Sequence, residues 1–127
     1  MSDKIAFSTA KAPKPAAAYS QGVRKGGILQ VAGQVSVDPA TGLIVGETVG
    51  EHTRQTLENV RAVLEEAGSG FDDVVMMRVY LTRREDFAEM NAVYEEFVRE
   101  PFPARTTVFV GLAEGLLVEI DALAVVG

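Results

Sequence analysis

The sequence predicts one α+β domain, residues 1–127, in which two helices cover one face of a mixed β-sheet. Three observations favour this class. The length is near the commonest size of a domain. Apolar residues recur at helical spacing in two segments, 50–70 and 84–100. Short runs of β-branched and apolar residues, bounded by glycine and proline, surround these segments and are typical of strands.

The N-terminal third of the chain predicts a short strand, a connection and a hairpin. The strand is expected around residues 5–8, and "KAPKPAAA" (11–18) follows as an extended connection. Two further strands flank Lys25-Gly26-Gly27, which is a hairpin signal. The cluster "DPATG" (38–42) then predicts a turn, since proline sets φ and glycine supplies positive φ.

The remaining elements alternate between helix and strand. The first helix has its apolar stripe at Leu57, Val60, Leu64 and Ala67, and Gly68 suits the position after its end. The second helix has its stripe at Phe87, Met90, Tyr94, Phe97 and Val98. Strands are expected over 72–82, over the segment that "FPART" (102–106) opens and that holds Arg105, and over 115–127. Because the strands are apolar on both faces and the helices cover only one, we expect an oligomer.

Composition excludes several classes of function. The net charge of −6 argues against nucleic acid as the main ligand, because such binding depends on a basic surface. The absence of cysteine removes disulfides, thiolate nucleophiles and cysteine-based metal sites. The single histidine, His52, is expected at the surface and cannot form a site of several histidines. A metal site made of carboxylates alone stays possible, although no EF-hand spacing is present.

The sequence also predicts where the protein works. No apolar run approaches the roughly 20 residues of a membrane span. The first 20 residues lack the basic flank and apolar block of a signal peptide. A cytoplasmic protein without membrane contact is therefore expected.

Charged residues interrupt the last two strands. Alternation places Glu119 and Asp121 on one face of the final strand, and Arg105 shares a face with Thr107 in the strand before it. If these strands form a hairpin about residues 111–115, Arg105 faces Asp121 and Thr107 faces Glu119. Two interpretations are open: a structural ion pair, or one carboxylate paired with Arg105 and the other handling a proton or a water.

Asn91 lies inside the apolar stripe of the second helix. A buried amide costs stability unless it is hydrogen-bonded. Asn91 could satisfy backbone groups, or it could line a pocket. Tyr19 stands at the entry of a strand, and taken alone its position indicates no function.

Seven ordered blocks of the chain resemble the Rid (YjgF) family, the reactive intermediate deaminases historically called L-PSP endoribonucleases. The resemblance runs from about residue 5 to residue 126. The blocks are "AYSQGV" (18–23), "VAGQVSVDPATG" (31–42), "TRQTLENVRAVLEEAG" (53–68), "DDVVMMRVYLT" (72–82), "MNAVYEEFV" (90–98), "FPART" (102–106) and "VEIDALAVV" (118–126).

The resemblance implies a chorismate-mutase-like fold and a homotrimer with ligand clefts between subunits. It implies hydrolysis of reactive enamines and imines, such as 2-aminoacrylate and 2-iminobutanoate, to 2-keto acids and ammonia. The ligand is then a small 2-imino or 2-keto acid, and neither metal nor cofactor takes part. Two alternatives are a non-catalytic module that binds small carboxylates, and the endoribonuclease or translation inhibitor of the family's historical label.

The resemblance also implies roles for single residues. Arg105 matches the arginine that anchors the substrate carboxylate, and Glu119 matches the glutamate that positions a water. Tyr19 matches the tyrosine of the family's "YSQ" block and is the third residue expected to act in catalysis. Asn91 matches the pocket asparagine, and Gly33 matches a glycine near the ligand.

The chain departs from the family pattern near the implied cleft. Thr107 stands where a cysteine is common, and that position is expected to contact the substrate mainly through its backbone. Ala32 replaces a serine, and Ala17-Ala18 replace a Gly-Pro pair. The loop at Leu112-Ala113 lacks the family's Leu-Pro and is about one residue shorter. Since specificity depends on such contacts, these changes leave the natural substrate open.

Overall fold

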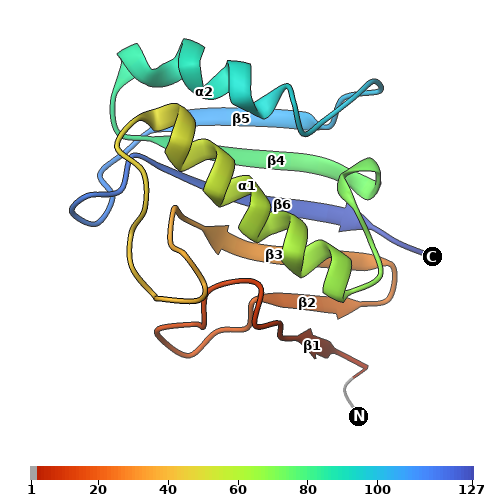
Figure 1. Cartoon of the computed structure of the whole chain (residues 1–127). Helices are drawn as coiled ribbons and strands as arrows, with labels where there is room; N and C mark the ends of the chain where they lie inside the picture. Colours follow the sequence, from red (N-terminus) through yellow and green to blue (C-terminus); the bar gives the residue numbers. More distant parts are fainter. Residues whose placement is uncertain (1–2) are drawn as a thin grey trace.

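The computed structural model describes residues 3–127, which form one six-stranded sheet with both α-helices on the same face (Figure 1). The strand order is β1-β2-β3-β6-β4-β5. The strands are β1 (Ile5–Phe7), β2 (Gly22–Lys25), β3 (Ile28–Gln34), β4 (Val74–Leu81), β5 (Ala104–Phe109) and β6 (Val118–Val125). The helices are α1 (Val49–Glu66), α2 (Phe87–Tyr94) and the 3-10 turns η1 (Phe71–Asp73) and η2 (Arg84–Asp86). The predicted α+β class is confirmed.

The turn chemistry read from the sequence is confirmed at three glycines. Gly26 has a φ of 58° in the β2–β3 hairpin, where Lys25 pairs with Ile28. Gly42 has a φ of 76° in the 38–42 turn. Gly68 also has a φ of 76° and follows the last residues of α1. Each glycine adopts the left-handed conformation that other residues reach only at a cost in strain.

The expected hairpin between the last two strands is wrong. β4 lies between them, parallel to β5 and antiparallel to β6. Arg105 is therefore opposite Met77, and Asp121 is opposite Arg78. The cause is the β4–α2–β5 crossover: α2 carries the chain back so that β5 runs parallel to β4 along its outer edge. The chain then passes β4 and pairs β6 on its other side.

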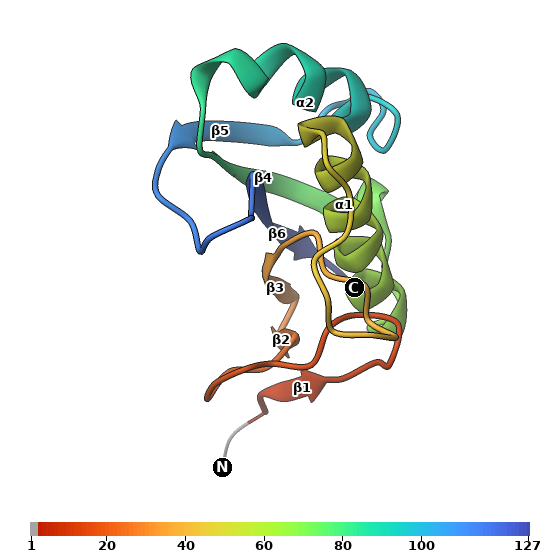
Figure 2. The same cartoon turned by 60° about the vertical axis from the view of Figure 1, so that its left-hand side comes forward.

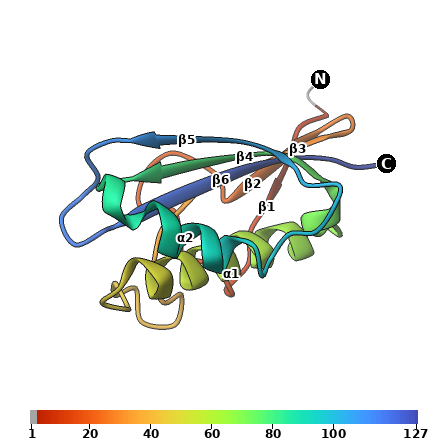
Figure 3. The same cartoon turned by 90° about the horizontal axis from the view of Figure 1, so that it is seen from above.

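The core lies between the sheet and the two α-helices, and it includes Met90 and Tyr94 of α2. β6 is central, between β3 and β4, and its alternate residues Val118, Ile120, Ala122 and Ala124 are fully buried. Both helices lie on one side of the sheet, both in the turned view of Figure 2 and in the view from above of Figure 3, and no element of the described chain covers the other side. That uncovered face carries the exposed apolar pair Ile28 and Val125. Exposed apolar residues on a sheet face agree with the expected oligomer, which stays a prediction.

Two expectations about the helices need correction. α2 ends at Tyr94, although the predicted helix extended over 84–100. The segment after it turns back toward β5 and includes a cis peptide bond before Pro101. His52 is buried rather than exposed, and its Nε2 lies 3.0 Å from the carbonyl oxygen of Gly46. His52 lies in the first turn of α1 and packs against Gly46 of the preceding loop.

α2 is tied to the N-terminus of α1 by one side chain. Glu89 accepts a hydrogen bond of 2.8 Å from the backbone N–H of Gly50. This carboxylate satisfies a donor that the helix itself leaves unpaired and lies at the positive end of the helix dipole. α2 is thereby held above β5. Among residues 3–127, no helix is both long and apolar enough to cross a membrane.

We expect Glu89→Ala to lower the free energy of unfolding by about 1 kcal/mol, because the Gly50 N–H loses its acceptor. Glu89→Gln keeps an acceptor oxygen and is expected to lose less. Urea denaturation at fixed protein concentration measures both. Glu85→Ala is the matched control, since Glu85 is exposed and makes only a 3.6 Å ion pair with Arg83. An unchanged stability of Glu89→Ala would contradict the capping role.

Candidate functional site

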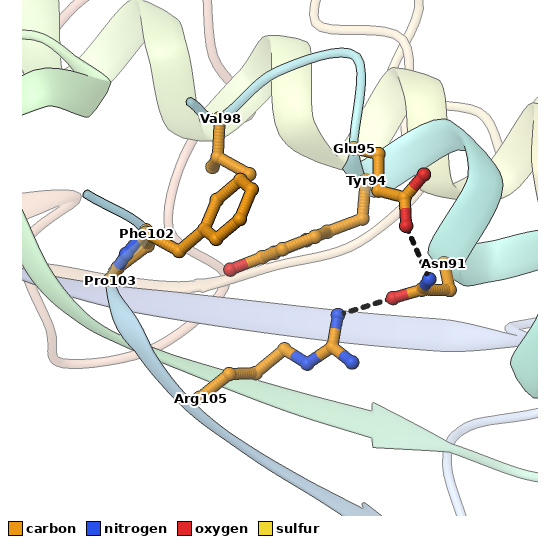
Figure 4. Close-up of a pocket in the computed structure, with 7 residues that line it drawn as sticks. All are labelled: Asn91, Tyr94, Glu95, Val98, Phe102, Pro103 and Arg105. Carbon is orange, nitrogen blue, oxygen red and sulfur yellow. Dashed lines mark hydrogen bonds between the residues drawn. The ribbon is translucent and has the colours of Figure 1, made fainter. Parts of the chain in front are cut away.

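Arg105 projects from the helix-facing side of β5 toward α2 (Figure 4). Its Nη1 donates a hydrogen bond of 2.7 Å to the Oδ1 of Asn91. Its guanidinium carbon lies 4.7 Å from the centre of the Tyr94 ring and 5.5 Å from that of Phe87. Such cation–π contacts favour a fixed arginine. The guanidinium is therefore held in one orientation by α2.

No carboxylate of the described chain forms an ion pair with Arg105, and its Nε and Nη2 have no hydrogen-bond partner there. The structural ion pair that the sequence left open is thus wrong for this arginine. A partly buried guanidinium usually has an anionic partner. Two adjacent nitrogen donors of Arg105, Nε and Nη2, remain available to bind an anion.

A pocket of about 350 Å³ lies between α2, β5 and the segment that joins them. Its walls are Asn91, Tyr94, Glu95, Val98, Phe102, Pro103 and Arg105. Asn91 therefore lines a pocket, and its amide donates to Glu95 Oε1 at 2.9 Å while its oxygen receives Arg105. Tyr94 is buried, its hydroxyl has no partner within residues 3–127, and burial raises its pKa. The guanidinium of Arg105 stacks over the Tyr94 ring.

Glu119 lies on the opposite, uncovered face of the sheet. It alternates with the buried Val118 and Ile120 of β6, so it points away from the helices. It is partly buried, and no hydrogen bond or ion pair reaches its carboxylate from the described residues. Burial raises the pKa of the Glu119 carboxyl, and the negative charge of Asp121 raises it further.

Gly33 leaves room for Glu119. A Cβ atom added at residue 33 would overlap Oε2 of Glu119. Residue 33 lies in β3 beside a shift of register between Val31 and Gln34. The glycine of the "GQ" block is thus explained by close approach of the carboxylate to the backbone.

Asp121 is paired, but with residues other than Arg105. Arg78 Nε donates to it at 2.8 Å, and the Tyr80 hydroxyl donates at 3.0 Å. Gln30 donates at 3.4 Å. Sequence reasoning missed these three residues, although Arg78 and Tyr80 alternate within an apolar strand and that pattern indicates a polar patch on one face.

Tyr19 and Thr107 stand apart from these two groups. Tyr19 is half exposed in the loop before β2 and lines a separate hollow with Lys14 and residues 35–42. Thr107 lies two residues beyond Arg105 on the same face of the edge strand β5. Within one chain the structure joins Arg105 to Asn91 and Glu119 to Gly33. Among the described residues, no group of three His, Cys, Asp or Glu side chains is placed to hold a metal ion.

Residues 9–126 match the family model described as endoribonuclease L-PSP. The chain belongs to this family. A RutC family protein of Pyrococcus abyssi is 46% identical over 125 residues, which is 98% of either chain. A Salmonella typhimurium protein named 2-iminobutanoate/2-iminopropanoate deaminase is 43% identical over 123 residues, 94% of this chain and 95% of that one. The crystal structure of E. coli TdcF with bound serine matches with a TM-score of 0.90, at 36% identity over 97% of this chain and 99% of that one.

These matches confirm the resemblance to the Rid family and the fold that it implied. They also support deaminase chemistry at the level of the family, since the name of the Salmonella relative states that activity. Arg105 and Glu119, the two charged residues to which the resemblance assigns roles, lie on opposite faces of the sheet in this structure.

We expect Glu119→Gln to stabilise the protein at pH 7.5 by about 1 kcal/mol, because an uncharged amide avoids the cost of burying a charge. The pKa of Glu119 is higher in the folded than in the unfolded chain, so ionised Glu119 destabilises the fold above its folded pKa. This cost disappears as the pH falls below 4.5, the ordinary value. Urea denaturation at pH 7.5 and pH 4 measures it.

The matched control is Glu114→Gln, which removes an exposed carboxylate from the loop before β6. Its free energy of unfolding is expected to equal that of the wild type at both pH values. A stabilisation by Glu119→Gln that is the same at pH 4 would show that the effect is not one of ionisation.

Proposed function

We propose that this protein is a hydrolytic deaminase that converts 2-imino acids, and the enamines in equilibrium with them, to 2-keto acids and ammonia. The observation that carries this proposal is Arg105, a fixed guanidinium in a pocket with no carboxylate partner in the described chain. The name of the Salmonella relative supports the reaction class. The small ligand bound to TdcF supports a site for amino-acid-like molecules.

Arg105 would anchor the substrate through its carboxylate. The Nε and Nη2 groups form the fork that binds a carboxylate with two parallel hydrogen bonds. Asn91 holds the third nitrogen, so the fork is already oriented before the substrate arrives. Thr107, on the same face of the edge strand, would border the bound molecule.

Glu119 would handle the water. A protonated imine carbon is electrophilic, so the reaction needs a positioned water and a base. Glu119 takes a proton as the water oxygen bonds to the imine carbon, and it returns that proton to the amine nitrogen. As the C–N bond breaks, Glu119 takes the proton of the new hydroxyl group, so ammonia leaves with the bonding electron pair and the hydroxyl oxygen becomes the keto oxygen. A raised pKa suits a carboxylate that both accepts and returns a proton near neutral pH.

Arg105 and Glu119 of one chain do not meet, since they lie on opposite faces of the sheet with β4 between their strands. We therefore propose a homotrimer in which a cleft between subunits joins Arg105 of one chain to Glu119 of the next. The uncovered apolar face offers the surface for that contact. Tyr19, half exposed on its loop, would complete the cleft as its third catalytic residue.

Adding the protein to threonine dehydratase acting on threonine is expected to accelerate release of keto acid and ammonia. Arg105→Ala is expected to lower kcat/KM roughly 100-fold, because the substrate carboxylate loses its charged partner. Arg84→Ala is the matched control, as Arg84 also lies over an aromatic ring, 4.8 Å from the centre of Phe109. Imines generated from several amino acids by an amino-acid oxidase extend the assay into a substrate panel.

Equal rates for wild type and Arg105→Ala would overturn the proposal. Binding of 2-ketobutyrate that depends on Arg105, without turnover of any imine, would instead support the carboxylate-binding module. Cleavage of RNA by the purified protein would support the historical label, which the charge of −6 argues against.

A second prediction tests the shared site. Arg105→Ala and Glu119→Ala are each expected to be inactive alone. When the two are unfolded and refolded together, mixed trimers contain some clefts with both intact residues. Activity is then expected to recover to about one quarter of the wild-type value, the fraction for random assembly around a ring. No recovery in mixed trimers identified by mass spectrometry would place both residues of a site on one chain.

A further inference from the structure

Asp121 lies two residues along β6 from Glu119 and points to the same uncovered face. Its side chain is only 13% exposed, and it receives donors from both neighbouring strands. Arg78 and Tyr80 of β4 donate at 2.8 and 3.0 Å, and Gln30 of β3 donates at 3.4 Å. Charge-assisted hydrogen bonds of this kind are short and hold a side chain in one orientation. Asp121 is therefore a fixed negative charge.

Glu119 has the contrasting environment. Its partner across the strands is Tyr80, yet the Tyr80 hydroxyl donates to Asp121 and not to Glu119. On the β3 side lies Gly33, which carries no side chain. The helices are on the other face of the sheet (Figure 3). Of the charged groups that the described strands place on this face, Asp121 is nearest to Glu119, and Arg78 lies beyond it.

The register explains why Arg78 affects Glu119 less than Asp121 does. Arg78 is directly opposite Asp121 and binds it through Nε. Its side chain is 45% exposed, so water screens its charge more than that of Asp121. Tyr80 is neutral, because burial and its bond to Asp121 raise its pKa. In the Asp121–Arg78 pair, the negative carboxylate therefore lies closer to Glu119 than the positive guanidinium does.

We propose that Asp121 is a positioning residue that acts through Glu119. The negative charge of Asp121 makes Glu119 a stronger proton acceptor, and the positive charge of Arg78 partly cancels this effect. This inference rests on the proposed role of Glu119 in imine hydrolysis. It assigns a role to the second carboxylate of the strand, which touches neither substrate nor water in the proposed reaction.

The proposal predicts shifts of opposite sign. Asp121→Asn removes a negative charge at roughly 7 Å, two residues along a strand. The acidic limb of the pH profile of kcat/KM is then expected to move down by about half a pH unit, the Coulomb effect at water-like screening. Arg78→Met leaves Asp121 uncompensated, and the limb is expected to move up by a smaller amount. Tyr80→Phe changes no charge and is expected to leave the limb in place.

Carbon-13 NMR of the Glu119 carboxyl group, titrated in the folded protein, gives the same shifts without any turnover. Opposite shifts for Asp121→Asn and Arg78→Met support the proposal, since loss of packing alone would not reverse sign with charge. Shifts in the same direction, or none, overturn it. If Asp121→Asn does not fold, the upward shift of Arg78→Met decides. If the protein shows no turnover but the NMR shifts are opposite, the proposed function is rejected and the electrostatic coupling between Asp121 and Glu119 is kept.

Discussion

The insertion of β4 between β5 and β6 is the constraint from which the arrangement of charged side chains follows. It separates Arg105 from Asp121 and places Asp121 opposite Arg78, which binds it. Within the described chain, the guanidinium of Arg105 then contacts the aromatic rings and the amide of α2. The insertion also makes β5 an edge strand. Two charges of opposite sign, Arg105 and Glu119, are therefore left without an ionic partner in the described chain, on opposite faces of one sheet.

Such charges cost stability, and the structure reduces the cost differently on the two faces. Arg105 keeps favourable contacts with Tyr94, Phe87 and Asn91 that need no anion. Glu119 has no comparable contact within the described chain, so burial acts on it directly and raises its pKa. A fold that keeps an uncompensated carboxylate beside a glycine that makes room for it is typical of a functional site rather than of a structural ion pair.

The sequence determines which face a residue occupies far better than which strand lies beside it. Alternation correctly places Glu119 with Asp121, and helical spacing correctly places Asn91 among the residues that face β5. The failed hairpin has a different cause: consecutive strands usually pair, and nothing in residues 110–117 shows that the chain passes over β4. The partners of Arg105 and Asp121 depend on that topology, so neither could be predicted from spacing.

The two carboxylates of β6 have different surroundings, although they lie on the same strand. They share a face and both end in a carboxylate, yet Asp121 receives three donors and Glu119 receives none in the described chain. Donors hold the Asp121 side chain in place, while burial and the negative charge of Asp121 raise the pKa of Glu119. The difference arises from the side chains opposite them, since Arg78 and Tyr80 both turn toward Asp121. The raised pKa of Glu119 thereby arises from burial and from a neighbour on its own strand.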